Sequence, residues 1–161
     1  MGEASKPGGS LSMVPGCRLL NVEPQTTVLK AIQLMAQAQT GAVVVTMENR
    51  CVGIFTAWDL LQFQAREPGS DLSSVHLGDV MTNKVISARP ADALMETVPL
   101  MLKSGIGYLP VMAEHCPAKM LRLVDILAYR YEVAEKKLAS LEGYVSDLMN
   151  DETDSADASN E

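Results

Sequence analysis

We predict an α/β fold built from two copies of a β-α-β-β-α unit that pack sheet against sheet, followed by a long C-terminal helix. Three features of the 161-residue chain carry this prediction. Part of the chain repeats at an offset of 66 residues, each copy has the apolar spacing of a helix followed by two strands, and the residues after the second copy keep a heptad pattern. One unit alone cannot cover its sheet, so the two copies are expected to form one module.

The repeat aligns residues 24–61 with residues 90–127 without a gap. The identical positions are Pro24/Pro90, Leu34/Leu100, Met35/Met101, Gly41/Gly107, Val45/Val111, Glu48/Glu114, Asp59/Asp125 and Leu61/Leu127. Apolar residues also stand opposite apolar residues, as at Ile32/Val98 and Ile54/Met120, which indicates two copies of one unit.

Each copy is expected to open with a short strand, at residues 18–22 and 84–88, and to pass through a proline into a helix. In the first copy, apolar residues recur at spacings of four and three from Val28 onward, which is typical of a helix. Gly41 and Gly107 follow this helix in the two copies. Since glycine is common just past a helix end, we expect them to cap it.

Two further strands and a second helix complete each copy. Residues 42–46 (AVVVT) and 51–55 (CVGIF) are apolar runs joined by the polar turn MENR. Residues 108–112 (YLPVM) and 118–123 (AKMLRL) repeat this arrangement around a second polar turn. Both pairs predict a hairpin followed by a helix.

Most of the net charge of −7 comes from the acidic end of the chain. Residues 150–161 contain five acids and no base, and the rest of the chain has 13 basic and 15 acidic residues, a balance that does not favour nucleic-acid binding. The expected layout is a disordered N-terminus (1–13), repeat one (14–65), a linker (66–78), repeat two (79–131), a helical extension (132–149) and a disordered acidic tail (150–161).

The composition favours a soluble, cytoplasmic protein. No apolar run approaches the ~20 residues needed to span a bilayer, and the N-terminus lacks the apolar centre of a signal peptide. The three cysteines, Cys17, Cys51 and Cys116, form no C-x-x-C pair and are odd in number, which suits reduced thiols. Adjacent His115 and Cys116 side chains are poorly placed to converge with Cys51 on zinc, so we expect no metal.

The stretch GIFTAWDLL (53–61) places Thr56 three residues before Asp59, where a strand runs into a helix. This spacing fits a capping box, in which each side chain bonds a free backbone N–H. It also fits a ligand site, because a carboxylate can accept hydrogen bonds from two neighbouring hydroxyls. Asp125 occupies the matching place in the second copy although Arg122 replaces the threonine, which favours a role beyond capping.

Three motifs together resemble a pair of cystathionine β-synthase (CBS) domains, also called a Bateman module. They are G-x-x-T-x-x-D at 53–59, DVMTNKV at 79–85 and GIGYLPV at 105–111, and the resemblance covers about residues 14–131. It implies two domains related by a pseudo-two-fold axis, with adenine nucleotides or S-adenosylmethionine held between their sheets. It also implies a regulatory module without catalysis that signals to an effector protein whose identity the sequence does not give.

The resemblance further implies which residues hold the ligand. Asp59 would bind the ribose hydroxyls and Thr56 the ribose or phosphate, while Ile54 and Leu109 would enclose the adenine ring. The full first-cleft set is Ile54, Thr56, Asp59, Lys84, Val85, Ile86, Gly107, Tyr108 and Leu109. Lys84 is the candidate phosphate partner, with an ordinary solvated lysine as the alternative.

A second cleft is related to the first by the repeat and departs from the motif. Its set is Arg18, Leu20, Gly41, Ala42, Arg122 and Asp125. Lys119 replaces Gly53 there and Arg122 replaces Thr56, so these side chains either fill the cleft or form a phosphate cradle. We favour a cleft filled by its own side chains.

The C-terminal helix carries an apolar stripe with the spacing of a coiled coil. The seam consists of Leu127, Tyr131, Ala134, Leu138, Leu141, Val145 and Leu148. A helix of about 25 residues is ~37 Å long and cannot lie wholly over a small domain, which favours pairing between two copies in a homodimer. The alternative is a helix folded back onto its own module, and Gly143 weakens a long rod.

Three classes of function follow: an adenine-nucleotide or S-adenosylmethionine sensor, a ligand-free scaffold for dimerisation and partner binding, and an independent enzyme. No nucleophile with a base and no paired acids stand out in the sequence. We therefore expect a sensor, with the scaffold as its alternative.

Overall fold

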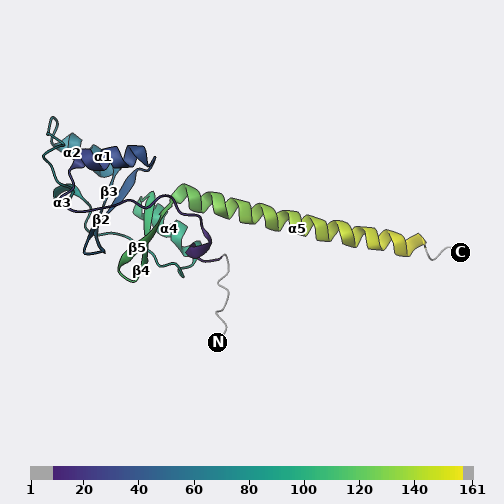
Figure 1. Cartoon of the computed structure of the whole chain (residues 1–161). Helices are drawn as coiled ribbons and strands as arrows, with labels where there is room; N and C mark the ends of the chain where they lie inside the picture. The colour runs from purple at the N-terminus through teal and green to yellow at the C-terminus, as the bar shows by residue number, and fades with distance from the viewer. Residues whose placement is uncertain (1–8, 158–161) are drawn as a thin grey trace. The chain divides into compact units, whose positions relative to one another are not determined.

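The computed structural model describes residues 9–157 and confirms the predicted α/β class (Figure 1). After a short 3-10 turn (Leu11–Met13), the elements are β1 (Asn21–Val22), α1 (Val28–Gln37), β2 (Ala42–Met47), β3 (Arg50–Thr56), α2 (Ala57–Arg66), α3 (Leu77–Val80), α4 (Leu94–Ser104), β4 (Tyr108–Ala113), β5 (Cys116–Arg122) and α5 (Leu123–Asp157). The chain divides into two compact units at residues 126 and 127, within α5.

The first repeat forms a three-stranded sheet in the order β1-β2-β3, with β1 parallel and β3 antiparallel to β2. Helix α1 packs against β2 and α2 against β3 (Figure 1). Alternation along β2 places Val43 and Val45 in the core beneath the helices and Ala42 and Val44 in a second cluster. The sheet is therefore apolar on both faces.

The second repeat has a two-stranded sheet, β4-β5, and the strand predicted at residues 84–88 is wrong. Only Ala88 pairs with β4 there. In the first repeat, the Val44 N–H donates to the Leu20 carbonyl at 2.8 Å. Pro110 occupies the place of Val44 and has no N–H to donate, so the matching strand loses its hydrogen bond.

The predicted helix caps at Gly41 and Gly107 are also wrong. The C-cap of helix α4 is Gly105, two residues before Gly107. It adopts a left-handed conformation (φ 65°) and donates its N–H to the Leu102 carbonyl at 3.2 Å. The C-cap of helix α1 is Ala38, and the left-handed residue that follows is Gln39 (φ 51°). Gly41 and Gly107 therefore stand at the entrance of the next strand and do not cap the helix.

The two repeats pack together through β3 and β5, as the sheet-to-sheet prediction requires. Ala42, Val44, Ile54 and Met120 form a buried cluster at this junction, with Val85, Tyr108, Leu19, Cys17 and Cys51 packed against it. Ile54 and Met120 are equivalent in the repeat, as are Ala42 and Tyr108. Equivalent positions meet at one place, as expected near a pseudo-two-fold axis.

The N-terminal segment is ordered from residue 9, so the disorder predicted for residues 1–13 is wrong for 9–13, while 1–8 lie outside the described residues. Leu11 is fully buried, and its N–H donates to the Asp92 carbonyl at 3.1 Å. Lys119 Nζ donates to the Leu11 and Val14 carbonyls at 3.0 and 2.6 Å. Buried Leu11, the bonds from Lys119 and backbone bonds to residues 90–94 anchor a stretch whose composition alone indicated a flexible tail.

Helix α5 carries the predicted seam, whose leucines and valine are exposed in the described structure. The helix continues to Asp157, into the segment expected to be disordered from residue 150; residues 158–161 lie outside the described part. Extending an existing helix adds a hydrogen bond per residue without a new nucleation cost, so polar residues can follow an established helix. No helix among the described residues has the length and apolarity to cross a bilayer.

Candidate functional site

Asp59 lies in the first turn of α2, and three donors hold its carboxylate. The N–H and the hydroxyl of Thr56 donate to Oδ2 at 2.8 and 2.6 Å, and the hydroxyl of Thr82 donates to Oδ1 at 2.9 Å. The N–H of Asp59 donates in turn to Thr56 Oγ1 at 3.3 Å, which completes a capping box. The capping alternative is therefore realised in the structure.

Thr82 is a site residue that the sequence reasoning missed. Its backbone pairs with Ile54 in both directions, at 2.8 and 3.0 Å, so the start of the second repeat lies against β3 of the first. Gly53 permits this approach, since a Cβ there would collide with the Met81 side chain. The signal was present in the sequence as the threonine of the DVMTNKV motif.

The structure brings some members of the first-cleft set together and separates others. Ile54, Val85 and Tyr108 pack in the cluster between the repeats. Leu109 is fully buried, so it presents no surface to a ligand in this structure. The remaining members, Lys84, Ile86 and Gly107, are exposed.

Two side chains of the second-cleft set bond to each other. Arg122 binds Asp125 through two hydrogen bonds, Nε to Oδ2 at 2.8 Å and Nη2 to Oδ1 at 2.6 Å. Asp125 therefore has a partner next to its helix start, and the inference that it lacked one is wrong. The hydroxyl of Tyr108 accepts the Gly41 N–H at 2.9 Å and stands where a Cβ on Gly41 would lie, so Tyr108 is directed toward this set.

The other basic residues do not form a phosphate cradle here. Lys119 bonds the N-terminal segment, and burial lowers the pKa of its amine. Arg18 is exposed, Leu20 accepts the backbone bond from Val44, and Ala42 is buried in the cluster between the repeats.

The Arg122–Asp125 pair should make the free energy of unfolding depend on pH in the acidic range. The guanidinium holds the pKa of Asp125 below its ordinary value. Because the folded-state pKa is the lower one, this stabilisation is complete above a pH of about 4 and is lost as the pH falls through the folded-state pKa. We expect Asp125→Asn to lose less stability than the unmodified protein between about pH 5 and about pH 3, measured by urea unfolding. Equal losses in the two proteins would contradict this assignment.

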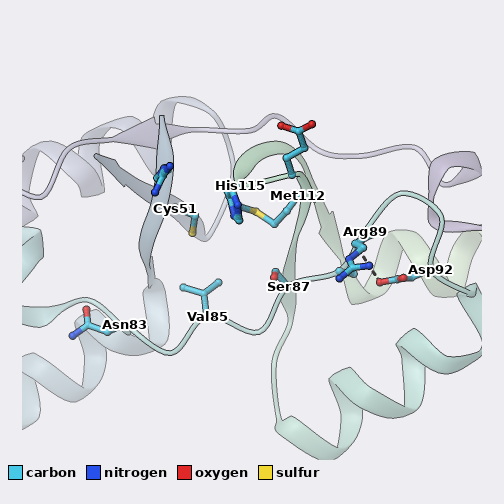
Figure 2. Close-up of a pocket in the computed structure, with 11 residues that line it drawn as sticks. Cys51, Asn83, Val85, Ser87, Arg89, Asp92, Met112 and His115 are labelled. Atoms are coloured by element: carbon cyan, nitrogen blue, oxygen red, sulfur yellow. Dashed lines mark hydrogen bonds between the residues drawn. The ribbon is translucent and has the colours of Figure 1, made fainter. Parts of the chain in front are cut away.

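A cavity of about 800 Å³ lies between the start of β3, residues 83–92 and the turn of the β4–β5 hairpin (Figure 2). Figure 2 shows Cys51, Val85 and His115 facing the same space from these three segments. The Cys51 N–H donates to the His115 carbonyl at 3.4 Å, which joins the repeats at this edge. Of the predicted ligand residues, Val85 lines this cavity.

The cavity combines a small apolar surface with charges of both signs. Val85, Ala88 and Met112 supply apolar atoms, and the charged groups are Arg50, Arg89, Asp92 and Glu114, with His115 beside them. Asp92 Oδ2 accepts the Arg89 N–H at 2.8 Å. Such a lining suits a polar ligand with both an apolar ring and a charged end.

Cys51 is not activated as a nucleophile in this cavity. Burial raises the pKa of the Cys51 thiol, which keeps it protonated. Within residues 9–157, the described side chains contain no group of three His, Cys, Asp or Glu placed to hold a metal ion.

Comparisons with known proteins agree with the fold and the repeat. The CBS domain family model matches residues 13–66 and 77–132. The chain is 27% identical over 124 residues to the CBS domain-containing protein CBSX3, mitochondrial, of Arabidopsis thaliana, covering 74% of this chain and 60% of that protein.

Two solved structures share the architecture. The CBS-pair protein CBSX2 from Arabidopsis thaliana has a TM-score of 0.69 at 22% identity, covering 80% of this chain and 98% of that one. The CBS domain pair of protein MJ0100, in complex with 5′-methylthioadenosine and S-adenosyl-L-methionine, has a TM-score of 0.68 at 18% identity, covering 76% and 96%. With both repeats matched by the family model, this chain belongs to the CBS domain family and carries two copies of the domain.

Proposed function

We propose that this chain is a regulatory CBS module that binds an adenosyl ligand between its repeats and transmits the binding to an effector protein, acting as a homodimer. The ligand class is AMP, ADP, ATP or S-adenosylmethionine. The observation that carries the proposal is a cavity lined by both repeats, which the chain segment after the Asp59 partner Thr82 enters. Thr82 donates to Asp59, and the next residue, Asn83, lines the cavity.

Asp59 has the chemistry to bind a ribose. Its carboxylate already accepts two hydroxyl donors, from Thr56 and Thr82, so the two hydroxyls of a ribose can replace donors of the same kind. A carboxylate bonded to hydroxyl donors forms charge-assisted bonds, which are stronger than bonds between neutral groups.

The cavity beside Val85 offers places for the rest of such a ligand. Apolar atoms of Val85 and Met112 suit an adenine ring, and Arg50 and Arg89 suit a phosphate or a carboxylate. Asp92 and Glu114 suit the cationic groups of S-adenosylmethionine. The MJ0100 pair was solved with adenosyl compounds, which supports testing that class first.

A ligand-free scaffold is the second candidate, and the completed capping box favours it. Thr56 and Asp59 satisfy each other without a ligand, and a Thr/Asp cap stabilises a helix by about 1 kcal/mol on its own. In this case the two repeats would serve only to dimerise and to present a surface to a partner.

A thermal-shift panel separates the two candidates. A ligand at a hundred times its dissociation constant stabilises the folded state by ~2.7 kcal/mol, equivalent to about 5–10 °C in a chain of this size. We expect a shift of this order with at least one of AMP, ADP, ATP and S-adenosylmethionine. No shift across the whole panel would favour the scaffold.

The two clefts should differ in their response to substitution. Arg122 and Asp125 bond each other, Lys119 bonds the N-terminal segment, and the Tyr108 hydroxyl accepts the Gly41 N–H. Asp125→Ala should therefore change the affinity for the best ligand by less than about threefold. Isothermal calorimetry measures this directly. A loss as large as that of Asp59→Ala would show that the second cleft also binds the ligand.

A further inference from the structure

The surface of α5 beside the apolar seam has a regular charge pattern. In heptad notation, Tyr131, Leu138 and Val145 occupy a, and Leu127, Ala134, Leu141 and Leu148 occupy d. The g positions preceding each a are Arg130, Lys137 and Tyr144, and the e positions following each d are Ala128, Glu135, Glu142 and Met149. Every charged g residue is therefore basic, and every charged e residue is acidic.

These charges are available to a partner. Glu135, Lys137 and Glu142 are exposed, Arg130 is half-exposed, and none of the four forms an ion pair within the described part of the chain. Gly143 falls at f, on the side of the helix opposite the seam, where the absence of a side chain leaves the apolar contact surface intact.

Charge complementarity selects one arrangement of two such helices. In a parallel pair in register, each g residue faces the e residue of the next heptad on the partner helix. Arg130 would then face Glu135 of the second copy, and Lys137 would face Glu142, with each contact occurring twice by symmetry. In an antiparallel pair, g faces g and e faces e, which places bases against bases and acids against acids.

We propose that α5 pairs with the α5 of a second copy of this chain as a parallel, in-register coiled coil, selected by these g–e contacts. The inference rests on the proposed homodimer and adds its orientation. Both copies of residues 9–126 are then attached at the same end of the coil, so a change in one module can reach the other through the shared seam.

The test compares full-length charge variants by sedimentation and by native mass spectrometry. Glu135→Lys with Glu142→Lys makes both edges of a parallel coil basic, so at low salt the dimer should weaken by at least about tenfold. The effect should shrink at about 1 M salt, where the screening length is ~3 Å. In an antiparallel coil, the same change replaces one like-charge contact by another, and the affinity should stay nearly constant.

A fully swapped variant adds Arg130→Glu and Lys137→Glu to these two changes. If the coil is parallel, this variant should regain the homodimer but should not pair with the unmodified chain. In such a mixed dimer, basic g residues would face basic e residues, and acidic g residues would face acidic e residues. Heterodimers above their statistical share would overturn the parallel arrangement. An unmodified chain that stays monomeric at tens of micromolar would instead refute the homodimer itself, so the two failures are distinguishable.

Discussion

Asp59→Ala is expected to reduce the rise in melting temperature that the best adenosyl ligand produces. The carboxylate is the acceptor proposed for both ribose hydroxyls, and removing charge-assisted hydrogen bonds of this kind costs ~1–3 kcal/mol. The affinity should therefore fall by about 5- to 150-fold. A thermal-shift titration of both proteins with the same ligand measures the change.

Thr56→Ala removes the same helix cap and a predicted ligand hydroxyl but keeps the carboxylate, so it separates the part played by the carboxylate from the loss of the cap. It removes the capping hydroxyl from α2 and leaves the Asp59 carboxylate and its bond from Thr82 available. Both variants should lower the melting temperature of the free protein by losing the cap, worth about 1 kcal/mol. If the ligand-induced shift of Asp59→Ala matches that of the unmodified protein, the site is placed wrongly.

Truncation after Ala128 is expected to dissociate the dimer while leaving the two repeats folded. The compact unit that contains both repeats ends at residue 126, and the truncation removes all but one residue of the apolar seam. Losing the contacts of three heptads should weaken the dimer by about a hundredfold or more, roughly 2.7 kcal/mol. Sedimentation measures assembly, and a cooperative thermal transition reports that the core still folds.

Removal of residues 150–161 alone is the control for this truncation. That segment has no apolar residue larger than alanine, so assembly should not change. If the chain truncated after Ala128 dimerises as tightly as the full chain, the seam is not the dimer contact.

The repeat made the fold class predictable from the sequence. Two copies with matching apolar positions required two similar hairpins, and the residues at the junction, Ile54 and Met120, are a repeat-related pair. The absence of a strand at residues 84–88 could also have been predicted from the sequence. Pro110 stands where Val44 donates its N–H to the first strand, and the alignment places the two residues opposite each other.

The N-terminal anchor could not be predicted from local composition. Residues 9–13 contain glycine and serines. Their fixed place comes from tertiary contacts: the burial of Leu11, the bond from Lys119 and backbone bonds to residues 90–94. The structure also shows the partner of Asp125, which the sequence alone did not indicate. Sequence alignment showed that Asp125 lacks a threonine partner, but the replacement Arg122 is long enough to bind the carboxylate itself.

The candidate site was predicted in part. The spacing of Thr56 and Asp59 gave the capping box, but the bond from Thr82 depends on how the second repeat lies against β3. The cavity could not be found in the sequence, because Cys51, Val85 and His115 come from three separate segments that the fold brings together.

The most direct test of the proposed function is calorimetric titration of the full-length protein with AMP, ADP, ATP and S-adenosylmethionine. We expect saturable binding of at least one of them at one site per chain, weakened by about 5- to 150-fold in Asp59→Ala and kept in Asp125→Ala. The absence of binding by all four compounds, or two equivalent sites per chain, would contradict it.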